Sequence, residues 1–404
     1  MGNDLNQNLA DSGDARHDLV VGLDAGGTRT RAMCASAAEG RLLGEGSGGP
    51  GNALTVPAPQ LTDHLAEAIA AAVPEPARGR VVAVAGGFAG ATGASADDPG
   101  YVHARSALTG ALRRLGIPSG PVALCSDIEA AFASAPGTPA DGLALVAGTG
   151  AVAMRIAGRR ATTTVDGDGW LLGDDGSGFW IGRSAVRAAL RMADGRGPGT
   201  GLAVLVGRAL GVPDGVLPGG PSGGVALGGS GAPGDGRRLG GGVTPDGLGD
   251  PAGPGGTGAS SGGGGPSAGG RVVSYDGGGP AVPDWPLAHR EAYRAHLLPA
   301  VMTDPPIRLA RLAPLVVEAA REKDAVAVGI LDEAADQLAE TVRALAPRPG
   351  EPLVATGGLL GPDGPLTEPL TIRLHPLGLT LGWVADGCRG AVALARLEHR
   401  GGGR

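Results

Sequence analysis

The sequence contains one local pattern twice: a short apolar run, a glycine-containing turn and a second apolar run. The first copy is Leu19–Leu23, followed by Asp24, a Gly-Gly turn and Thr30–Ser36. The second copy is Leu143–Ala147, followed by Gly-Thr-Gly and Val152–Ala157. Short apolar runs bounded by glycine turns predict buried strands. Because each copy precedes further strand and helix patterns, the sequence predicts an internally duplicated α/β protein with two lobes.

Additional elements are expected after each copy. Buried strands are predicted over Val81–Ala85, Val122–Cys125 and Leu353–Ala355. Apolar residues at helical spacing predict helices over Leu61–Val73, Ala104–Leu115, Arg183–Ala193, Arg290–Thr303, Ile307–Arg321, Ala325–Leu345 and Ala385–Leu397. We therefore expect an N-terminal α/β lobe over residues 19–126 and a C-terminal α/β lobe over residues 127–404.

One long segment does not fit either lobe. From about residue 211 to residue 280 the chain is mostly Gly, Pro and Ser, and about thirty of its 78 glycines lie there. Burial of so little apolar surface cannot offset the conformational entropy that the segment would lose on folding. A disordered insert is therefore expected. Residues 1–18 are polar and are expected to form a disordered tail without the apolar region of a signal peptide.

Charge and cysteine content exclude several classes of protein. The net charge is −7, and no Lys/Arg run with interleaved aromatics occurs, which argues against nucleic acid and anionic membrane surfaces as partners. No apolar run approaches the roughly 18 residues of a membrane span. Cys34, Cys125 and Cys388 are widely separated and form no CxxC, which argues against a disulfide framework, a zinc site or a self-contained iron–sulfur site. We expect a cytoplasmic protein.

The first glycine turn is suited to binding phosphate. Gly26 and Gly27 lack side chains, so backbone N–H groups can approach an oxyanion, and Thr28 adds a hydroxyl. Asp24, at the end of the preceding run, could hold a magnesium ion directly or through water. An ordinary hairpin turn is the alternative. Asp, Gly-Gly and Thr together exceed what a turn needs and favour the phosphate loop.

The second turn, Gly148-Thr149-Gly150, is a weaker signal on its own. A dinucleotide-binding fingerprint would need this loop to open a helix, whereas the residues from Val152 continue as a strand. On this loop alone, a hairpin turn and a phosphate loop fit equally. Its likeness to the first turn favours a second phosphate loop in the other lobe.

Asp127 follows the strand predicted over Val122–Cys125. An acid at the carboxyl end of a parallel strand is where α/β proteins place catalytic groups. A helix N-cap is the alternative, since Asp is a favoured capping residue. The phosphate loops on either side of it favour a catalytic base.

Two further segments could bind ligands. Residues 167–182 combine acids and glycines with Trp170 ahead of a helix, which indicates a ligand-binding loop, with a solvated turn as the alternative. For Phe179 and Trp180 in the same segment, ordinary core packing is favoured. The strand ending at Ala355 leads into Gly357-Gly358, where a backbone without side chains could let an adenine ring lie flat; a plain turn fits equally.

In their order along the chain, the motifs DAGGT, SD, GTG, GWLLGDDGSGFWIG and TGG resemble those of the BadF/BadG/BcrA/BcrD-type ATPase family, and within it the N-acetylglucosamine kinases. The resemblance covers about residues 19–200 and 290–404. It implies the duplicated, two-lobed ribonuclease H-like fold of the actin and hexokinase superfamily. It also implies an ATP-dependent kinase that converts an amino sugar to its 6-phosphate with ATP and Mg²⁺. N-acetylglucosamine is the favoured substrate.

The resemblance also implies roles for individual residues. ATP would be bound by Gly26, Gly27, Thr28, Gly148, Thr149, Gly150, Gly357 and Gly358, with Mg²⁺ near Asp24. The sugar would be bound by Asn52, Asp127, Gly169, Trp170 and Asp174, with Asp127 as the catalytic residue. Ala151 departs from the family, which usually has Ser after GTG, so a hydroxyl contact is lost while the backbone N–H remains.

Two other functions fit the sequence less well than the kinase does. Activating ATPases of 2-hydroxyacyl-CoA dehydratases hold an iron–sulfur cluster between two subunits, but Cys125 and Cys388 lack the paired arrangement that this needs. A sugar-responsive repressor would need a helix-turn-helix, which the polar residues before Leu19 cannot supply. The expected partners are ATP and an amino sugar, and a homodimer is compatible with the sequence without being fixed by it.

Overall fold

The computed structural model describes residues 18–92, 97–118, 120–219 and 285–401. The expected disordered tail lies almost entirely outside these ranges, as does most of the expected insert. Nearly all residues of the two expected lobes fall within them.

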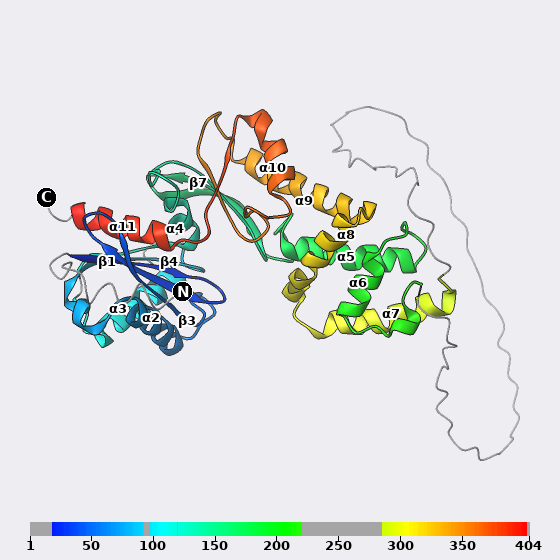
Figure 1. The fold of residues 1–404 in the computed structure, drawn as a ribbon, viewed down its shortest axis with the longest axis horizontal. Coiled ribbons are helices and arrows are strands. Elements are labelled where there is room, and N and C mark those ends of the chain that lie inside the picture. Colours follow the sequence, from blue (N-terminus) through cyan, green and yellow to red (C-terminus); the bar gives the residue numbers. More distant parts are fainter. Residues whose placement is uncertain (1–17, 93–96, 119, 220–284, 402–404) are drawn as a thin grey trace, which may run out of the picture.

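Each lobe is built on a five-stranded mixed sheet (Figure 1). The first sheet has the order β3-β2-β1-β4-β5, with strands β1 (Leu19–Ala25), β2 (Thr30–Ser36), β3 (Leu42–Gly48), β4 (Val81–Phe88) and β5 (Val122–Ser126). The second has the order β10-β9-β6-β7-β8, with strands β6 (Gly142–Ala147), β7 (Ala151–Ala157), β8 (Arg160–Asp166), β9 (Leu353–Thr356) and β10 (Leu381–Trp383).

The two sheets are connected in the same way. In each, the first three strands form an antiparallel meander, and the last two are added parallel to the first strand. β1 therefore corresponds to β6, and β5 corresponds to β10. The predicted duplicated, two-lobed α/β architecture is confirmed, and each predicted glycine turn is a hairpin between the first two strands of its sheet.

In the first lobe, α2 (Ala58–Ala72) and α3 (Pro99–Arg114) cover one face of the sheet. Their apolar residues form one core with the sheet; Leu61, Leu65 and Leu108 are fully buried in it. The opposite face is covered by α11 (Cys388–Gly401), whose Val392 and Ala395 belong to a buried cluster with strands of the first sheet. The short helix η1 spans Glu75–Arg80.

Two helices connect the lobes, each directly after the last parallel strand of a sheet. α4 (Asp127–Ala133) follows β5, and its Phe132 packs against Ala144 and Val354 of the second sheet. α11 follows β10 and packs on the first sheet. The chain thus returns to the first sheet at its end, because α11 packs there.

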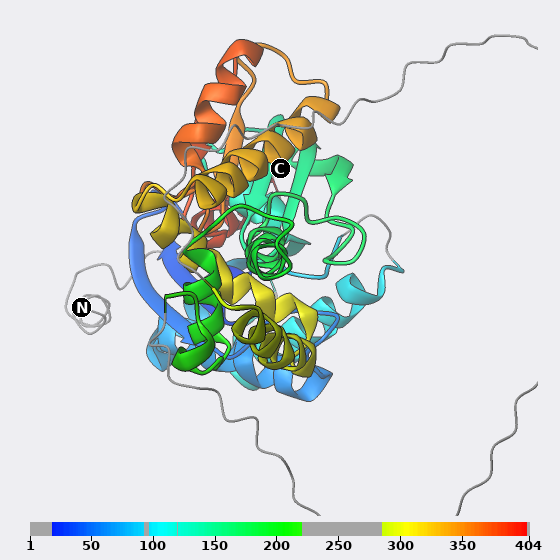
Figure 2. The ribbon, with the colours of Figure 1, turned by 90° about the vertical axis from the view of Figure 1, so that its right-hand side faces the viewer.

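The second lobe carries a larger set of helices, seen in front in Figure 2. They are α5 (Gly178–Ala193), α6 (Leu202–Ala209), α7 (Leu287–Thr303), α8 (Ala313–Arg321), α9 (Ala325–Ala344) and α10 (Thr367–Leu374), with short helices η2 (Asp214–Val216), η3 (Pro306–Leu312) and η4 (His375–Leu377). The single helix predicted over Ile307–Arg321 is in fact η3 followed by α8, with a proline in the first turn of α8. Proline lacks the N–H that a continuous helix needs at this point.

The first residues of the predicted insert lie within the described ranges. Val212, Val216 and Leu217 are buried in the core of the second lobe, so residues 211–219 belong to that lobe. Trp285, the first residue described after the gap, donates its indole N–H to the Val216 carbonyl at 2.9 Å. The Trp285 side chain therefore lies against Val216, close to the point where the described chain stops before the gap. Within the described ranges, none of the helices combines the length and apolar character that a bilayer span requires.

Candidate active site

The turn between β1 and β2 presents backbone and hydroxyl groups to solvent. Gly26 donates its N–H to the Arg29 carbonyl at 3.0 Å, which closes the turn. Gly27 and Thr28 are exposed, and a Cβ at Gly27 would meet no atom within 4 Å. This turn therefore has open space beside Gly27 and an exposed Thr28, which is compatible with a phosphate-binding turn.

The loop that carries Asn52 is attached to this turn. The Gly51 N–H donates to the Gly26 carbonyl at 2.8 Å. Asn52 accepts bonds at its Oδ1 from the N–H groups of Leu54 (2.9 Å) and Thr55 (3.1 Å). Its amide NH₂ makes no hydrogen bond within the described part of the chain. Asn52 is thus held by its oxygen, and its nitrogen remains as a donor for a ligand.

Asp127 is the first residue of α4, so it is not the N-cap. Ser126 is the cap: its Oγ accepts from the Glu129 N–H at 3.1 Å, and Glu129 accepts in turn from the Ser126 N–H at 2.8 Å. This reciprocal capping box satisfies the helix start. The Asp127 carboxylate accepts from the Ile128 N–H at 3.0 Å and also interacts with its own backbone N–H. Capping therefore does not explain Asp127, which leaves its carboxylate free for another role.

Glu129 also joins the two lobes. It is almost fully buried, and its second oxygen accepts from the Ala161 N–H of β8 at 2.8 Å. Arg160 lies 3.7 Å from the same carboxylate. One buried side chain thus fixes the start of α4 against a strand of the second sheet, and with it the position of Asp127.

Burial and nearby acids raise the pKa values of Asp127 and Asp24. Burial raises the pKa of Asp127 to about 6, and the negative charge of Asp24 acts in the same direction. The pKa of Asp24 is itself raised, first by burial and then by the negative charge of Asp386. A carboxylate whose pKa lies close to neutral is suited to accepting a proton.

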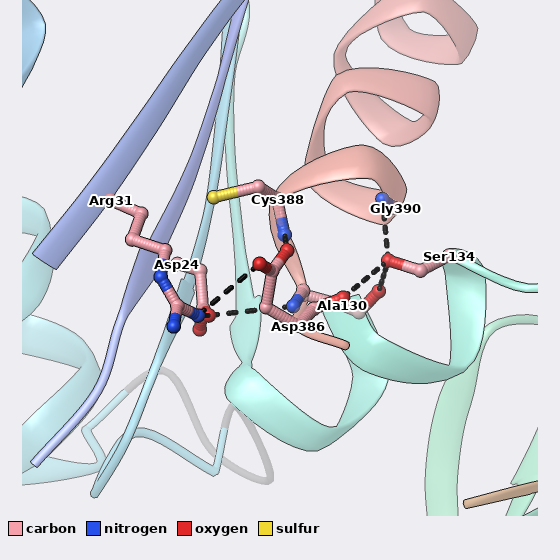
Figure 3. Close-up of polar contacts among 8 residues, drawn as sticks. Asp24, Arg31, Ala130, Ser134, Asp386, Cys388 and Gly390 are labelled. Atoms are coloured by element: carbon pink, nitrogen blue, oxygen red, sulfur yellow. Dashed lines mark hydrogen bonds and ion pairs between the residues drawn. The ribbon is translucent and has the colours of Figure 1, made fainter. Parts of the chain in front are cut away.

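Asp386 precedes α11, close to Asp24 (Figure 3). Arg31 lies between the two acids, with its Nη1 3.2 Å from Asp386 Oδ2 and 3.5 Å from Asp24 Oδ2. The Gly387 N–H also approaches Asp24 Oδ2, at 3.4 Å. The helix predicted to start at Ala385 begins instead at Cys388, because Asp386 turns its side chain back onto the Cys388 N–H at 3.0 Å.

These residues fit a magnesium ion in part. Asp24, Asp386 and Cys388 bring possible ligand atoms within 4.8 Å of one another. Carboxylate oxygens are the donors that Mg²⁺ prefers. Burial keeps the pKa of the Cys388 thiol far above its ordinary value, so this thiol stays protonated and does not suit a hard cation. Asp24 is the carboxylate adjoining the exposed turn and is the best-placed ligand.

The turn between β6 and β7 is the counterpart in the second lobe. Thr149 is exposed, and the carbonyls of Gly148 and Thr149 accept from the first N–H groups of α5, at 2.8 and 3.1 Å. The Ala151 N–H donates to Asp174 Oδ1 at 3.0 Å. A Cβ at Gly150 would lie 2.7 Å from that same oxygen, so only glycine allows this approach.

Gly357 and Gly358 lie against this second turn. A Cβ at Gly357 would lie 2.2 Å from the Ala147 carbonyl oxygen, and its φ of 106° also favours glycine. At Gly358 a Cβ would meet nothing within 4 Å, which leaves the backbone accessible. The predicted adenosine-binding pair is therefore next to the predicted phosphate loop.

The loop after β8 has a partly exposed aromatic residue. Trp170 is 38% exposed and contacts Phe179 edge to face, with ring centroids 6.0 Å apart. Phe179 and Trp180 are buried, as the core-packing interpretation predicts. Gly169, with φ 82°, and Asp166 shape the loop; Asp166 accepts from the N–H groups of Asp174 and Asp175 at 2.7 and 2.9 Å.

The predicted site residues thus fall into two groups. One group lies on the first lobe and comprises Asp24, Gly26, Gly27, Thr28, Asn52 and Asp127. The other lies on the second lobe and comprises Gly148, Thr149, Gly150, Gly169, Trp170, Asp174, Gly357 and Gly358. Sequence reasoning missed Arg31, Glu129 and Asp386. The signal for Asp386 was present, because an acid between a strand and a helix is the pattern that singled out Asp127.

Comparison with known proteins identifies the fold and the family. Candidate N-acetylglucosamine kinases from Chromobacterium violaceum and Porphyromonas gingivalis have similar structures, with TM-scores of 0.56 and 0.57 and sequence identities of 19% and 18%. Those alignments cover 94% and 95% of this chain and 99% of each of the other two, and at such identities they support the shared fold alone. No match was found among curated protein sequences.

Residues 21–366 match the BadF/BadG/BcrA/BcrD ATPase family, which confirms the resemblance drawn from the sequence motifs. The two-lobed actin- and hexokinase-type fold is confirmed with it. The match includes both glycine turns, Asp127 and Gly357-Gly358. The chain therefore belongs to the BadF/BadG/BcrA/BcrD ATPase family and, as a member of it, uses ATP.

Proposed function

We propose that this protein is an ATP-dependent kinase that phosphorylates an amino sugar, N-acetylglucosamine, to its 6-phosphate. The observation that carries the proposal is the placement of Asp127. Ser126, and not the Asp127 carboxylate, is the N-cap of α4; the pKa of Asp127 is raised to about 6, in part by the negative charge of Asp24 beside the first glycine turn. A base beside a phosphate-binding turn is what transfer of a phosphoryl group to a hydroxyl requires.

In this proposal the exposed turns of the two lobes hold the phosphates of ATP from either side. Thr28 and Thr149 provide hydroxyl donors, and Gly27 and Gly150 provide backbone N–H groups, since those of Gly26 and Gly148 close their turns. Asp24 holds Mg²⁺, which would neutralise charge on the transferred phosphate. Asp127 accepts the proton of the sugar 6-hydroxyl as that oxygen attacks. Because such transfer leaves little covalent chemistry to the protein, positioning by the two lobes is the main contribution.

The sugar is proposed to lie between Asn52 and the loop of Gly169 and Trp170. The amide nitrogen of Asn52 is a donor for a sugar oxygen. The exposed part of Trp170 offers an apolar surface for the face of the sugar ring or the acetyl group. The remaining oxygen of Asp174 is proposed to accept from a sugar hydroxyl, while its Oδ1 holds the second turn.

The positions of the cysteines argue against the alternative function, activation of a 2-hydroxyacyl-CoA dehydratase. Cys34, Cys125 and Cys388 are all buried, and burial raises the pKa of each thiol. A cluster shared between two subunits needs thiolates at a common surface. We further propose a cytoplasmic location, where ATP is available, and a homodimer, which size-exclusion chromatography with light scattering would test.

A coupled assay of ADP formation across a panel of sugars tests the function. N-acetylglucosamine, N-acetylmannosamine, N-acetylgalactosamine, glucosamine and glucose should be compared, and the product identified by phosphorus NMR. The proposal predicts the highest kcat/KM with N-acetylglucosamine and a 6-phosphate product. ATP hydrolysis that is independent of every sugar, without a phosphosugar product, would contradict it.

A further inference from the structure

Asp386 occupies the same topological position in the second lobe as Asp127 in the first. Each residue follows the last parallel strand of its sheet and precedes the helix that crosses to the other lobe. The duplication thus places two acids at the two crossings. Asp127 has a role in the proposed function, whereas Asp386 has none.

The partner of Asp386 is Arg31, on β2. The Arg31 Nη1 donates a hydrogen bond to Asp386 Oδ2 at 3.2 Å. The same nitrogen is 3.5 Å from Asp24 Oδ2, an ion-pair distance at which it makes no hydrogen bond (Figure 3). Arg31 therefore gives its hydrogen bond to Asp386 and is only ion-paired with Asp24. The side chains of both acids are largely buried, at 15% exposure for Asp24 and 17% for Asp386. A charge-assisted hydrogen bond from Arg31 is therefore strong at whichever of the two acids accepts it.

Asp386 is held firmly in this position. Its Oδ1 accepts from the Cys388 N–H at 3.0 Å, and its carbonyl accepts from the Ser134 hydroxyl at 2.9 Å. Ser134 Oγ also accepts from the Gly390 N–H at 2.7 Å. Ser134 is the C-cap of α4, so it links the two crossing segments to each other. An acid anchored through both its side chain and its backbone can fix the position of a long arginine side chain.

We propose that Asp386 is a positioning residue that takes the Arg31 hydrogen bond, so that the Asp24 carboxylate, which Arg31 approaches only as an ion pair, stays available to a divalent cation. The proposal rests on the role of Asp24 in the proposed function and deepens it. An arginine hydrogen-bonded directly to Asp24 would compete with the cation for the same oxygens. Holding that arginine on Asp386 keeps its positive charge near the phosphates without blocking the metal.

Binding of Mn²⁺, a probe for Mg²⁺, tests this without an assay of activity. The affinity of the purified protein for Mn²⁺ in the presence of AMPPNP would be measured by electron paramagnetic resonance. Asp386→Asn removes the negative charge but keeps an oxygen that can accept from the Cys388 N–H. Asp386→Ser also removes the charge, and its hydroxyl oxygen can accept from the same N–H. Arg31→Gln removes the guanidinium group that would compete with the metal ion for Asp24. The decisive variant is the double substitution Asp386→Asn with Arg31→Gln.

We expect Asp386→Asn to weaken Mn²⁺ binding by about tenfold, the scale of one charge-assisted hydrogen bond transferred to Asp24. Arg31→Gln alone should not weaken it. In the Arg31→Gln background, Asp386→Asn should change the affinity by less than about threefold. Thermal melts would show that each variant is folded, and Asp386→Ser replaces Asp386→Asn if the latter is not.

Three results would overturn the proposal. An equal loss of Mn²⁺ affinity in both backgrounds would mean that Asp386 acts on the cation itself and not through Arg31. Unchanged affinity in Asp386→Asn would mean that Arg31 does not compete. A parent protein that binds no Mn²⁺ with AMPPNP would also overturn it, while the sugar panel would still decide the proposed kinase function separately.

Discussion

The Asp174 Oδ1 atom accepts a hydrogen bond from the Ala151 N–H at 3.0 Å, across 23 residues of sequence. The acid on the proposed sugar loop is thereby attached to the proposed phosphate loop. Ala151 is also the position at which the family usually has Ser, and the backbone N–H that survives this change is the group that Asp174 uses. The sugar side and the nucleotide side of the second lobe are thus connected through one side chain.

Substituting Asp174 in two ways should separate these roles. Asp174→Asn keeps an acceptor for the Ala151 N–H, whereas Asp174→Ala does not. We expect the KM for ATP to stay near the parent value in the Asn variant and to rise about five- to tenfold in the Ala variant, the cost of one hydrogen bond. The KM for the sugar should rise in both. Steady-state kinetics with each substrate varied would measure this, and equal ATP effects in both variants would contradict the loop contact.

The pH dependence of turnover should report the ionisation of Asp127. Its pKa is raised from 3.8 to about 6, so the carboxylate is largely protonated below that pH and cannot accept a proton. We therefore expect kcat/KM, which reports groups in the free enzyme, to rise with pH and level off above about pH 7. A profile that is flat from about pH 5 to about pH 8 would contradict a base with this pKa.

The same shift makes a prediction about stability. Between about pH 4 and 6 the folded protein binds more protons at Asp127 than the unfolded chain does, so the free energy of unfolding should fall as pH rises through this window. Asp127→Asn cannot titrate and should weaken that dependence. Urea unfolding of parent and variant at several pH values would measure it, and identical slopes in the two proteins would count against the raised pKa.

Glu129 should contribute strongly to stability although it touches no proposed substrate. Glu129→Ala leaves the N–H groups of Ser126 and Ala161 without their acceptor, at a cost of roughly 2–4 kcal/mol in the free energy of unfolding. Glu129→Gln offers one acceptor in place of two, so its free energy of unfolding should lie between those of the parent and Glu129→Ala. Glu398→Ala, on the exposed side of α11, is the matched control and should change stability by less than about 0.5 kcal/mol. Chemical denaturation would measure these free energies. Similar effects of Glu129→Ala and Glu398→Ala would contradict a stabilising role for the Glu129 contacts between α4 and β8.

The segment between Gly219 and Trp285 should be replaceable. Trp285 is hydrogen-bonded to the Val216 carbonyl, so a short Gly-Ser linker can span the gap, and long loops add little closure entropy. Replacing residues 220–284 should leave kcat/KM within about threefold, whereas Trp285→Ala should destabilise the second lobe by about 3 kcal/mol because it removes a buried aromatic. Loss of most activity in the shortened protein would show that the segment serves the reaction.

Much of the fold could be predicted because its signals are local. The buried strands carry continuous apolar runs, and the turns carry glycine, so β1, β2, β6 and β7 were all expected. Strands β3, β8 and β10 were not expected, and all three are edge strands; β8 reads Arg-Ala-Thr-Thr-Thr-Val-Asp and is largely exposed. Edge strands need not alternate in the way that half-buried strands do.

The site was predictable where a motif is continuous in sequence and not where it depends on long-range contacts. Each glycine turn is read from a few neighbouring residues. The pairing of Arg31 with Asp386 spans 355 residues, and the contact of Glu129 with β8 depends on how the lobes pack. Gly22 in β1 shows the same limit: a Cβ there would strike the backbone of α11, 2.4 Å from the Val392 nitrogen, a contact that no local pattern reveals.

The turnover of Asp127→Asn tests the central claim most directly. The change is nearly isosteric, and because Ser126 caps α4, it leaves the helix start intact. It removes the ability to accept a proton from the attacking hydroxyl, which is typically worth about 10²–10⁴-fold. We predict a fall in kcat of that size, with ATP binding by calorimetry and the melting temperature close to those of the parent. A kcat within about threefold of the parent value would contradict the assignment of Asp127 as the catalytic base.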